Sequence, residues 1–191
     1  TPPLFFSYDK DDVYNYYKKL ADAVSIPMMI YYNPAAGFQM DADFAARVFE
    51  VDNVTAIKWT SSDYYQMQRL RDITQGDMNI INGPDEMLLM GLNAGADGGI
   101  GTTYNIMPDW FCSLYDAFRA GALSRAQQLQ FRINRVIEVL RRQPSIIAAT
   151  KEVFRYRGID VGPAAYPAYR YSAEASAVMQ RQMRELGVPD V

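Results

Sequence analysis

The sequence predicts an α/β protein built on a parallel sheet. Through residue 122, short apolar runs alternate with amphipathic segments at intervals of about 20 to 25 residues, and after that point only amphipathic segments follow. Parallel strands joined by helices occur in open doubly wound sheets and in (β/α)8 barrels. Both folds bind ligands at the carboxyl ends of the strands, so the residues at those ends are the first candidates for chemistry.

Four short apolar runs have the length of buried strands and end at turn-forming residues. The segments between them have the three- and four-residue apolar spacing of helices, and Asp, Ser or Pro residues mark the helix starts. The expected strands are residues 26–34, 54–59, 78–82 and 98–101. The expected helices around them are 9–23, one from Asp41 or Asp43 to 50, one from Ser61 and Ser62 to 74, 85–93, and one from Pro108. Three more helices are expected at 124–142, 145–156 and 173–186.

The composition excludes several kinds of site. The chain of 191 residues has no His, one Cys (Cys112) and a net charge of −3. It therefore has no Ser-His-Asp or Cys-His catalytic unit, no histidine-ligated metal, no internal disulfide and no Cys-rich zinc site. Its basic residues are scattered, and no apolar run approaches the roughly 20 residues that cross a bilayer. We expect a cytoplasmic protein with no nucleic-acid or membrane partner.

The position of Lys58 suggests chemistry. It lies inside the expected strand 54–59 between Ile57 and Trp59, whereas the other four lysines lie on segments with polar faces. Partial desolvation favours the neutral amine, which is nucleophilic toward carbonyl groups and forms Schiff bases. The alternative is a lysine at a strand end that extends to water or pairs with an acid.

Tyr31 lies near the end of the first expected strand, shortly before Pro34. In a chain without His, a phenol beside an amine is a candidate for moving protons. The sequence contains 14 Tyr, so aromatic packing is the alternative for any one of them.

Two later strand ends carry polar or flexible residues. Asp85 and Glu86 follow the turn at Asn82-Gly-Pro84, where they can cap a helix or bind a polyhydroxylated ligand. The glycine-rich segment 95–105 lets a ligand approach the backbone, although it lacks the glycine spacing and the lysine of a P-loop.

Four segments carry a family resemblance: Tyr31-Tyr-Asn-Pro34, Ala56-Ile-Lys-Trp-Thr-Ser61, Asn82-Gly-Pro-Asp-Glu86 and Gly95-Ala-Asp-Gly-Gly-Ile-Gly-Thr-Thr-Tyr-Asn-Ile-Met107. In order and spacing they resemble the N-acetylneuraminate lyases. These belong to the pyruvate-dependent class I aldolase superfamily, which also contains dihydrodipicolinate synthase. The resemblance covers nearly the whole chain, and its last segment is the most specific.

The resemblance implies the C-terminal half of a (β/α)8 TIM barrel (strands 5–8) in residues 1–122 and a C-terminal three-helix extension of the same domain in 123–191. It implies a homotetramer that reversibly cleaves N-acetylneuraminate, a sialic acid, to N-acetylmannosamine and pyruvate without a metal or an organic cofactor. Lys58 matches the lysine that forms the covalent imine with substrate or pyruvate, and Tyr31 matches the tyrosine that relays the proton. The positions that contact the sugar are Thr60, Gly83, Asp85, Glu86 and Thr102.

Three features depart from the superfamily pattern. The Gly-Ser/Thr-Thr-Gly-Glu motif that binds the pyruvate carboxylate is absent. Phe5 and Phe6 stand in a stretch that usually carries tyrosines, one of which serves the proton relay across a subunit contact. Pro84 replaces an aromatic or polar residue. We therefore expect Phe5 and Phe6 to alter the proton relay and Pro84 to alter the preference among sugars.

Two other functions stay open. One is a different pyruvate-dependent aldolase or dehydratase acting on 2-keto-3-deoxy sugar acids, and the other is a catalytically inactive ligand-binding homologue. Dihydrodipicolinate synthase activity is less favoured. That enzyme has an arginine shortly after the Tyr-Asn-x-Pro turn, which would fall near Ala36, and this chain has no Arg there. A (β/α)8 barrel takes about 250 residues and eight strands, whereas this sequence predicts four strands. We therefore expect the sequence to be the C-terminal portion of a polypeptide with roughly 100 more residues upstream.

Overall fold

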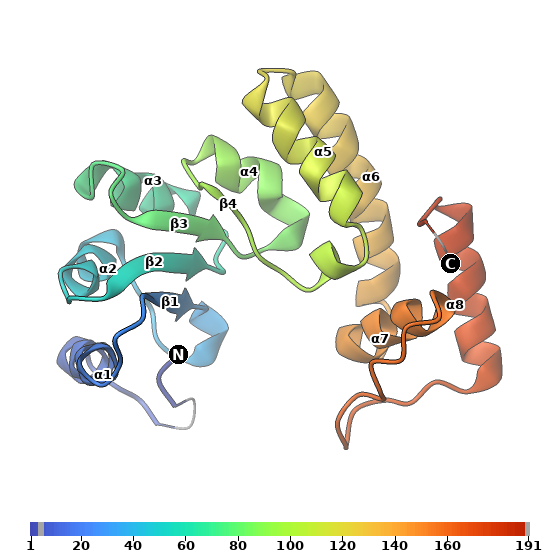
Figure 1. Cartoon of the computed structure of the whole chain (residues 1–191), viewed down its shortest axis with the longest axis horizontal. Coiled ribbons are helices and arrows are strands. Elements are labelled where there is room, and N and C mark those ends of the chain that lie inside the picture. Colours follow the sequence, from blue (N-terminus) through green and yellow to red (C-terminus); the bar gives the residue numbers. More distant parts are fainter. Residues whose placement is uncertain (4–5, 190–191) are drawn as a thin grey trace. The chain divides into compact units, whose positions relative to one another are not determined.

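The computed structural model describes residues 1–3 and 6–189 (Figure 1). The chain forms two compact units, Thr1–Ile100 and Gly101–Val191. The strands of the first unit are β1 (Met28–Tyr32), β2 (Val54–Trp59), β3 (Asn79–Asn82) and β4 (Gly98–Gly99). Its helices are α1 (Lys10–Asp22), α2 (Ala42–Phe49), α3 (Tyr64–Ile73) and α4 (Leu88–Asn93), with the 3-10 turns η1 (Pro34–Ala36) and η2 (Asp85–Met87).

The four strands form one parallel sheet in the order β1-β2-β3-β4. Helices alternate with the strands along the chain, and neighbours in sequence are neighbours in the sheet, as in a (β/α)8 barrel. The fold class predicted from the sequence, half of such a barrel, is confirmed. The domain boundary predicted after residue 122 stays a prediction.

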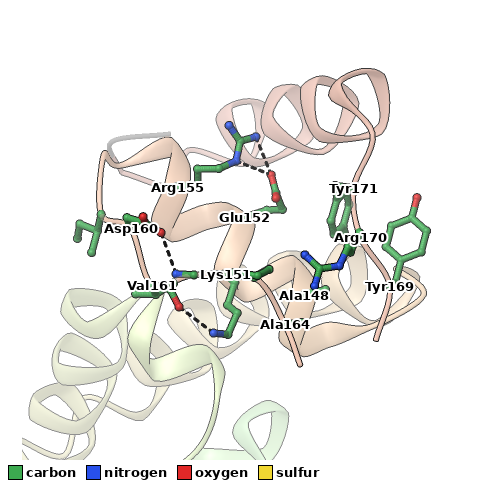
Figure 2. Close-up of a pocket in the computed structure, with 13 residues that line it drawn as sticks. Ala148, Lys151, Glu152, Arg155, Asp160, Val161, Ala164, Tyr169, Arg170 and Tyr171 are labelled. Carbon is green, nitrogen blue, oxygen red and sulfur yellow. Dashed lines mark hydrogen bonds and ion pairs between the residues drawn. The ribbon is translucent and has the colours of Figure 1, made fainter. Parts of the chain in front are cut away.

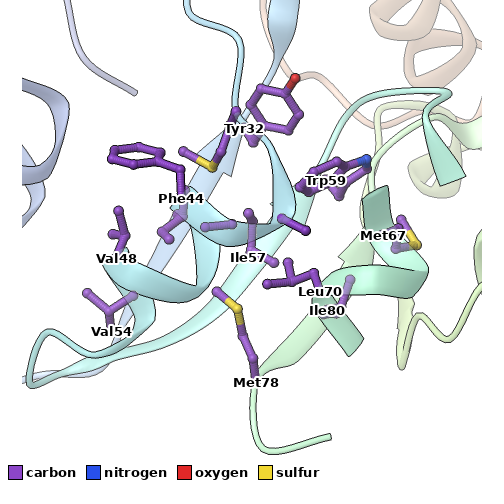
Figure 3. Close-up of a cluster of buried hydrophobic side chains, with 14 of the residues drawn as sticks. Tyr32, Phe44, Val48, Val54, Ile57, Trp59, Met67, Leu70, Met78 and Ile80 are labelled. Carbon is purple, nitrogen blue, oxygen red and sulfur yellow. The ribbon is translucent and has the colours of Figure 1, made fainter. Parts of the chain in front are cut away.

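The sheet has one face packed against helices and one face that they leave open. Alternate strand residues, among them Ile30, Ile57 and Ile80, are fully buried in a core shared with α1, α2 and α3 (Figure 3). Side chains alternate between the two faces of a strand, so Tyr31 and Lys58 point to the open face. There Tyr31 is 39% exposed and Lys58 is half-buried.

The pairing of β1 with β2 contains one irregularity. Met28 pairs with Val54, but the next residue, Met29, pairs with Ala56. One extra residue of β2 is accommodated at this step, as in a β-bulge. From Met29 onward the register is regular, so Tyr31 pairs with Lys58, which pairs on its other side with Ile81 of β3.

The observed helix starts confirm one predicted cap and correct another. Asp41 caps α2, where its side chain accepts a hydrogen bond from the Phe44 amide. The prediction that Ser61 and Ser62 open the next helix is wrong, because Asp63 is the cap of α3 and accepts from the Gln66 amide. The Ser61 hydroxyl instead accepts a hydrogen bond from the Asp63 amide within the preceding turn.

Two other element boundaries differ from the prediction. The fourth strand ends at Gly99 rather than at 101, consistent with the weak strand-forming tendency of glycine. The helix predicted over 85–93 is divided into η2 and α4, and α4 begins only at Leu88.

The second unit is helical, with the short turn η3 (Thr103–Asn105) followed by α5 (Pro108–Arg119), α6 (Leu123–Arg141), α7 (Ile146–Tyr156) and α8 (Ala173–Glu185). The long helix α6 buries one apolar stripe that includes Leu129, Ile133 and Val136. A Tyr156 hydroxyl that donates to the Ser176 carbonyl at 2.6 Å connects α7 to α8. Among the described residues, no helix is long and apolar enough to cross a membrane.

Replacing Asp41 should separate the contribution of its helix cap from that of its charge. Its two carboxylate oxygens accept from the Phe44 amide at 2.8 Å and from Lys10 Nζ at 2.6 Å. We expect Asp41→Ala to lower the free energy of unfolding by about 0.5–2 kcal/mol, and Asp41→Asn, which keeps a good cap residue, to lower it less. Thermal unfolding of the full-length variants measures the difference.

The same carboxylate predicts a pH dependence. The hydrogen bond from Lys10, followed by that from the Phe44 amide, holds the pKa of Asp41 below its ordinary value of 3.8. A lowered pKa in the folded state contributes stability above the unfolded pKa, and the contribution is lost as the pH falls through the folded pKa. The stability difference between the native protein and Asp41→Asn should therefore shrink below about pH 4. A difference that stays constant down to pH 2 would contradict this expectation.

Candidate active site

The structure brings Lys58 and Tyr31 together on the open face of the sheet. They are paired residues of neighbouring strands, and Lys58 Nζ lies 4.6 Å from the centre of the Tyr31 ring. The distance is within the range of a cation–π contact. The amine and the phenol that the sequence singled out separately are thus neighbours.

Thr60 and Gly83 continue the sheet beyond the ends of β2 and β3. The Thr60 amide donates to the Tyr32 carbonyl at 2.8 Å, and the Gly83 amide donates to the Trp59 carbonyl at 2.9 Å. The two residues are so close that a Cβ on Gly83 would lie 2.1 Å from Thr60 Oγ1 and 2.7 Å from Thr60 Cα. Position 83 therefore requires glycine, for a steric reason that motif spacing alone does not reveal.

The Thr60 hydroxyl is a buried polar atom with no hydrogen-bond partner among the described residues. Leaving such a group unpaired costs about 1–3 kcal/mol. Because Thr60 follows Lys58 by two residues, both side chains are directed to the same side of the extended chain. The hydroxyl is enclosed in this structure, and its contact with a ligand beside the Lys58 amine stays a prediction.

Asp85 and Glu86 lie in η2, directly after Gly83 and Pro84. Asp85 is only 8% exposed. Pro84 precedes η2 and Met87 precedes α4, and both acids lie in the first turn of η2, so their interpretation as groups that stabilise a helix start stays a prediction. Their alternative role, as acceptors of hydrogen bonds from a polyhydroxylated ligand, stays a prediction.

The remaining predicted positions belong to other segments of the chain. Thr102 belongs to the second unit, where it is the residue before η3. Phe5, at which the sequence departs from the expected tyrosines, lies outside the described residues, whereas Phe6 is exposed. The other lysines have structural surroundings: Lys10 pairs with Asp41, and Lys18 pairs with Asp22.

Sequence reasoning assigned no role to Tyr64 and Asn82, which contact each other beneath the turn that carries Asp85 and Glu86. The Tyr64 hydroxyl donates to Asn82 Oδ1 at 3.2 Å. Asn82 appears in the motif, but 18 residues separate it from Tyr64, and no local pattern links the two. Only the folded chain reveals the pair.

The second unit contains a cavity of about 430 Å³ between α7 and the following loop (Figure 2). Its charged groups serve the local structure: Lys151 Nζ donates to the Val161 carbonyl at 2.9 Å, and Arg155 pairs with Glu152 at 2.7 Å. Asp160 accepts from the Gly162 amide at 2.8 Å. None of the predicted site residues lines this cavity, so the site at the strand ends remains the candidate active site.

Comparison with known proteins identifies the family. The model of the dihydrodipicolinate synthetase family matches residues 1–186. The chain belongs to this family.

Among the described residues, no group of three His, Cys, Asp or Glu side chains is placed to hold a metal ion.

Several similar proteins are named N-acetylneuraminate lyase, and a solved structure from Bacillus anthracis that is 26% identical with a TM-score of 0.85 is named dihydrodipicolinate synthase. An N-acetylneuraminate lyase of Rhizobium meliloti is 35% identical and covers 95% of this chain, and one of Citrobacter koseri is 32% identical and covers 97%. The solved structure of Proteus mirabilis N-acetylneuraminate lyase, 26% identical, superposes with a TM-score of 0.89 over 98% of the chain. The chain spans 60% and 64% of the length of the first two relatives and 64% of the third.

Proposed function

We propose that the protein is a class I aldolase that cleaves N-acetylneuraminate to N-acetylmannosamine and pyruvate through an imine on Lys58. Family membership and the names of the similar lyases support this activity. The observation that carries it is the placement of the Lys58 amine beside the Tyr31 phenol on the open face of the sheet.

The reaction begins when the neutral amine of Lys58 attacks C2 of the open-chain sugar acid and water leaves to form a protonated imine. Tyr31 relays the proton from the C4 hydroxyl, whose electrons form the aldehyde carbonyl as the C3–C4 bond breaks. The electron pair of that bond passes to the imine nitrogen and gives an enamine. Protonation at C3 and hydrolysis then release pyruvate and restore the amine.

The other parts of the site bind the sugar. Thr60 offers an unpartnered hydroxyl, and Asp85 and Glu86 offer carboxylates that accept hydrogen bonds from hydroxyl groups. Thr102 is proposed as a sugar contact on the strength of the resemblance alone. The chemistry needs neither a metal nor an organic cofactor, because the imine itself withdraws electrons from the breaking bond. We infer a homotetramer as the assembly, on the strength of the resemblance.

Covalent trapping tests the proposal. The full-length protein is incubated with pyruvate and borohydride, and the modified peptide is located by mass spectrometry. A reduced adduct on Lys58 is the expected result, and its absence would refute the aldolase. Pyruvate release from N-acetylneuraminate should then exceed release from 2-keto-3-deoxygluconate; the reverse order would assign the enzyme to sugar acids without the N-acetyl group.

Replacing Tyr31 with Phe should slow turnover by about 10²- to 10⁴-fold, because the proton relay is lost while the ring is retained. Trapping of pyruvate on Lys58 should persist. Tyr32→Phe is the matched control, since Tyr32 is the next residue of β1 but is buried in the helix-facing core against Trp59. Equal turnover of the native protein and Tyr31→Phe would remove Tyr31 from the mechanism.

A further inference from the structure

We propose that Tyr64 and Asn82 are positioning residues that hold the acidic turn, residues 83–86, in the geometry that binds the hydroxyl groups of the substrate. The inference rests on the proposed function and extends it to two residues that need not touch the substrate. It concerns sugar recognition and leaves imine formation on Lys58 unaffected.

Asn82 fastens the turn from within. It is the last residue of β3, and its side chain is fully buried. Its Nδ2 donates to the Pro84 carbonyl at 2.7 Å, a bond that closes the chain over Gly83. This bond holds the Pro84 backbone, in the middle of the acidic turn, against Asn82, the residue before the turn.

Tyr64, the first residue of α3, fastens the turn from outside. Its hydroxyl lies 3.2 Å from Asn82 Oδ1 and 3.3 Å from the Met87 carbonyl. These acceptors lie on either side of the acidic turn. The single hydroxyl hydrogen of Tyr64 is thus shared between an acceptor before the acidic turn and an acceptor after it.

The Asn82 side chain is packed closely against the backbone of α4. It lies against Gly91 of α4, where a Cβ would be only 2.3 Å from Asn82 Oδ1 and 2.6 Å from Asn82 Cβ. Because residue 91 has no side chain, the backbone of α4 lies directly against the Asn82 amide. Glycine at position 91 is thus part of the arrangement that fixes the rotamer of Asn82.

The electrostatics keep the Tyr64 hydroxyl as a donor. Burial raises the pKa of Tyr64 well above its ordinary value, and the negative charge of Glu86 raises it further. The phenol therefore stays protonated at physiological pH. A protonated phenol close to Glu86 retains the hydrogen that the Asn82 and Met87 oxygens accept.

The residues before η2 and α4, Pro84 and Met87, supply no side-chain cap, although such caps commonly fix a helix start. The Tyr64 and Asn82 hydrogen bonds hold the chain at the residue before the turn, at Pro84 and at Met87 after it, on both sides of Asp85 and Glu86. If the hydroxyl is lost, the carboxylates are expected to shift relative to the substrate, and small displacements of binding groups weaken binding.

The test compares Tyr64→Phe with Tyr65→Phe in the full-length protein. Each variant loses one phenol hydroxyl, and the two residues are adjacent in α3. Tyr65 differs from Tyr64 in being 67% exposed. We expect Tyr64→Phe to raise KM for N-acetylneuraminate about tenfold, with kcat changed by less than about threefold. Pyruvate trapping on Lys58 should equal that of the native protein, and Tyr65→Phe should change none of these quantities.

A second variant tests the inner hydrogen bond. Asn82→Asp keeps the shape and an acceptor for Tyr64 but loses the donor to the Pro84 carbonyl. It should raise KM in the same direction while trapping on Lys58 is retained.

The outcomes distinguish this inference from the function on which it rests. If the native protein forms the Lys58 adduct and Tyr64→Phe has the KM of Tyr65→Phe, the positioning role is refuted while the aldolase stands. If Tyr64→Phe reduces trapping as strongly as it raises KM, the residue supports the whole site and the specific role is again refuted. If the native protein forms no Lys58 adduct, the proposed function fails first.

Discussion

Lys58→Ala should abolish the borohydride-trapped pyruvate adduct and reduce cleavage of N-acetylneuraminate by at least about 10³-fold. No other lysine is close to the strand-end residues by sequence position, so none is expected to substitute for it. The loss should be chemical rather than structural, because Lys58 is half-buried on the open face and is not part of the helix-facing core.

Lys19→Ala provides the matched control for this experiment. Lys19 lies on the exposed face of α1, so its replacement should leave trapping and turnover unchanged. Thermal unfolding of both variants verifies that the fold is intact. Residual adduct on another residue of Lys58→Ala would show that the amine has been assigned to the wrong position.

Gly83→Ala should be the most damaging change of a single carbon atom at the site. The added Cβ would lie 2.7 Å from Thr60 Cα, and a backbone atom cannot move aside as the end of a flexible side chain can. We expect a loss of about 1–3 kcal/mol in the free energy of unfolding. Substrate binding should also weaken, because Thr60 and the acidic turn are pushed apart.

Gly98→Ala separates the steric effect from a general effect of adding a methyl group to a strand glycine. At Gly98 a Cβ would make an ordinary contact of 4.0 Å with Ile81 Cδ1. Chemical denaturation of the two full-length variants measures the difference. Equal stability of Gly83→Ala and Gly98→Ala would mean that the close approach to Thr60 is relieved at little cost.

The parts of the structure that depend on local patterns could be predicted from the sequence. Alternation of apolar and polar positions in Ile57-Lys-Trp59 correctly indicates that the lysine points away from the core that buries its two neighbours. Strand β2 was predicted with its observed limits, Val54–Trp59. The cap at Asp41 followed from the same kind of local rule.

The parts that depend on contacts between distant segments could not be predicted. Competition between Ser61, Ser62 and Asp63 for the start of α3 is decided by the turn that connects β2 to the helix. The requirement for glycine at position 83 comes from Thr60, which is on another strand end. The Tyr64 to Asn82 hydrogen bond likewise joins segments that have no shared sequence signal.

The irregular step between Met28 and Met29 leaves Thr55 as a residue of β2 with no pairing partner in β1. Removing a single residue from β2 ahead of Lys58 would leave every residue of the proposed mechanism in the sequence. Removal of Thr55 would give a regular ladder in which Lys58 still pairs with Tyr31. Removal of Ile57 with the irregular step kept would instead pair the lysine with Ile30 and turn the amine toward the helices. A search for active relatives should therefore compare where residues are lost ahead of the lysine, since one position tolerates the loss and the next ones change the face that carries the amine.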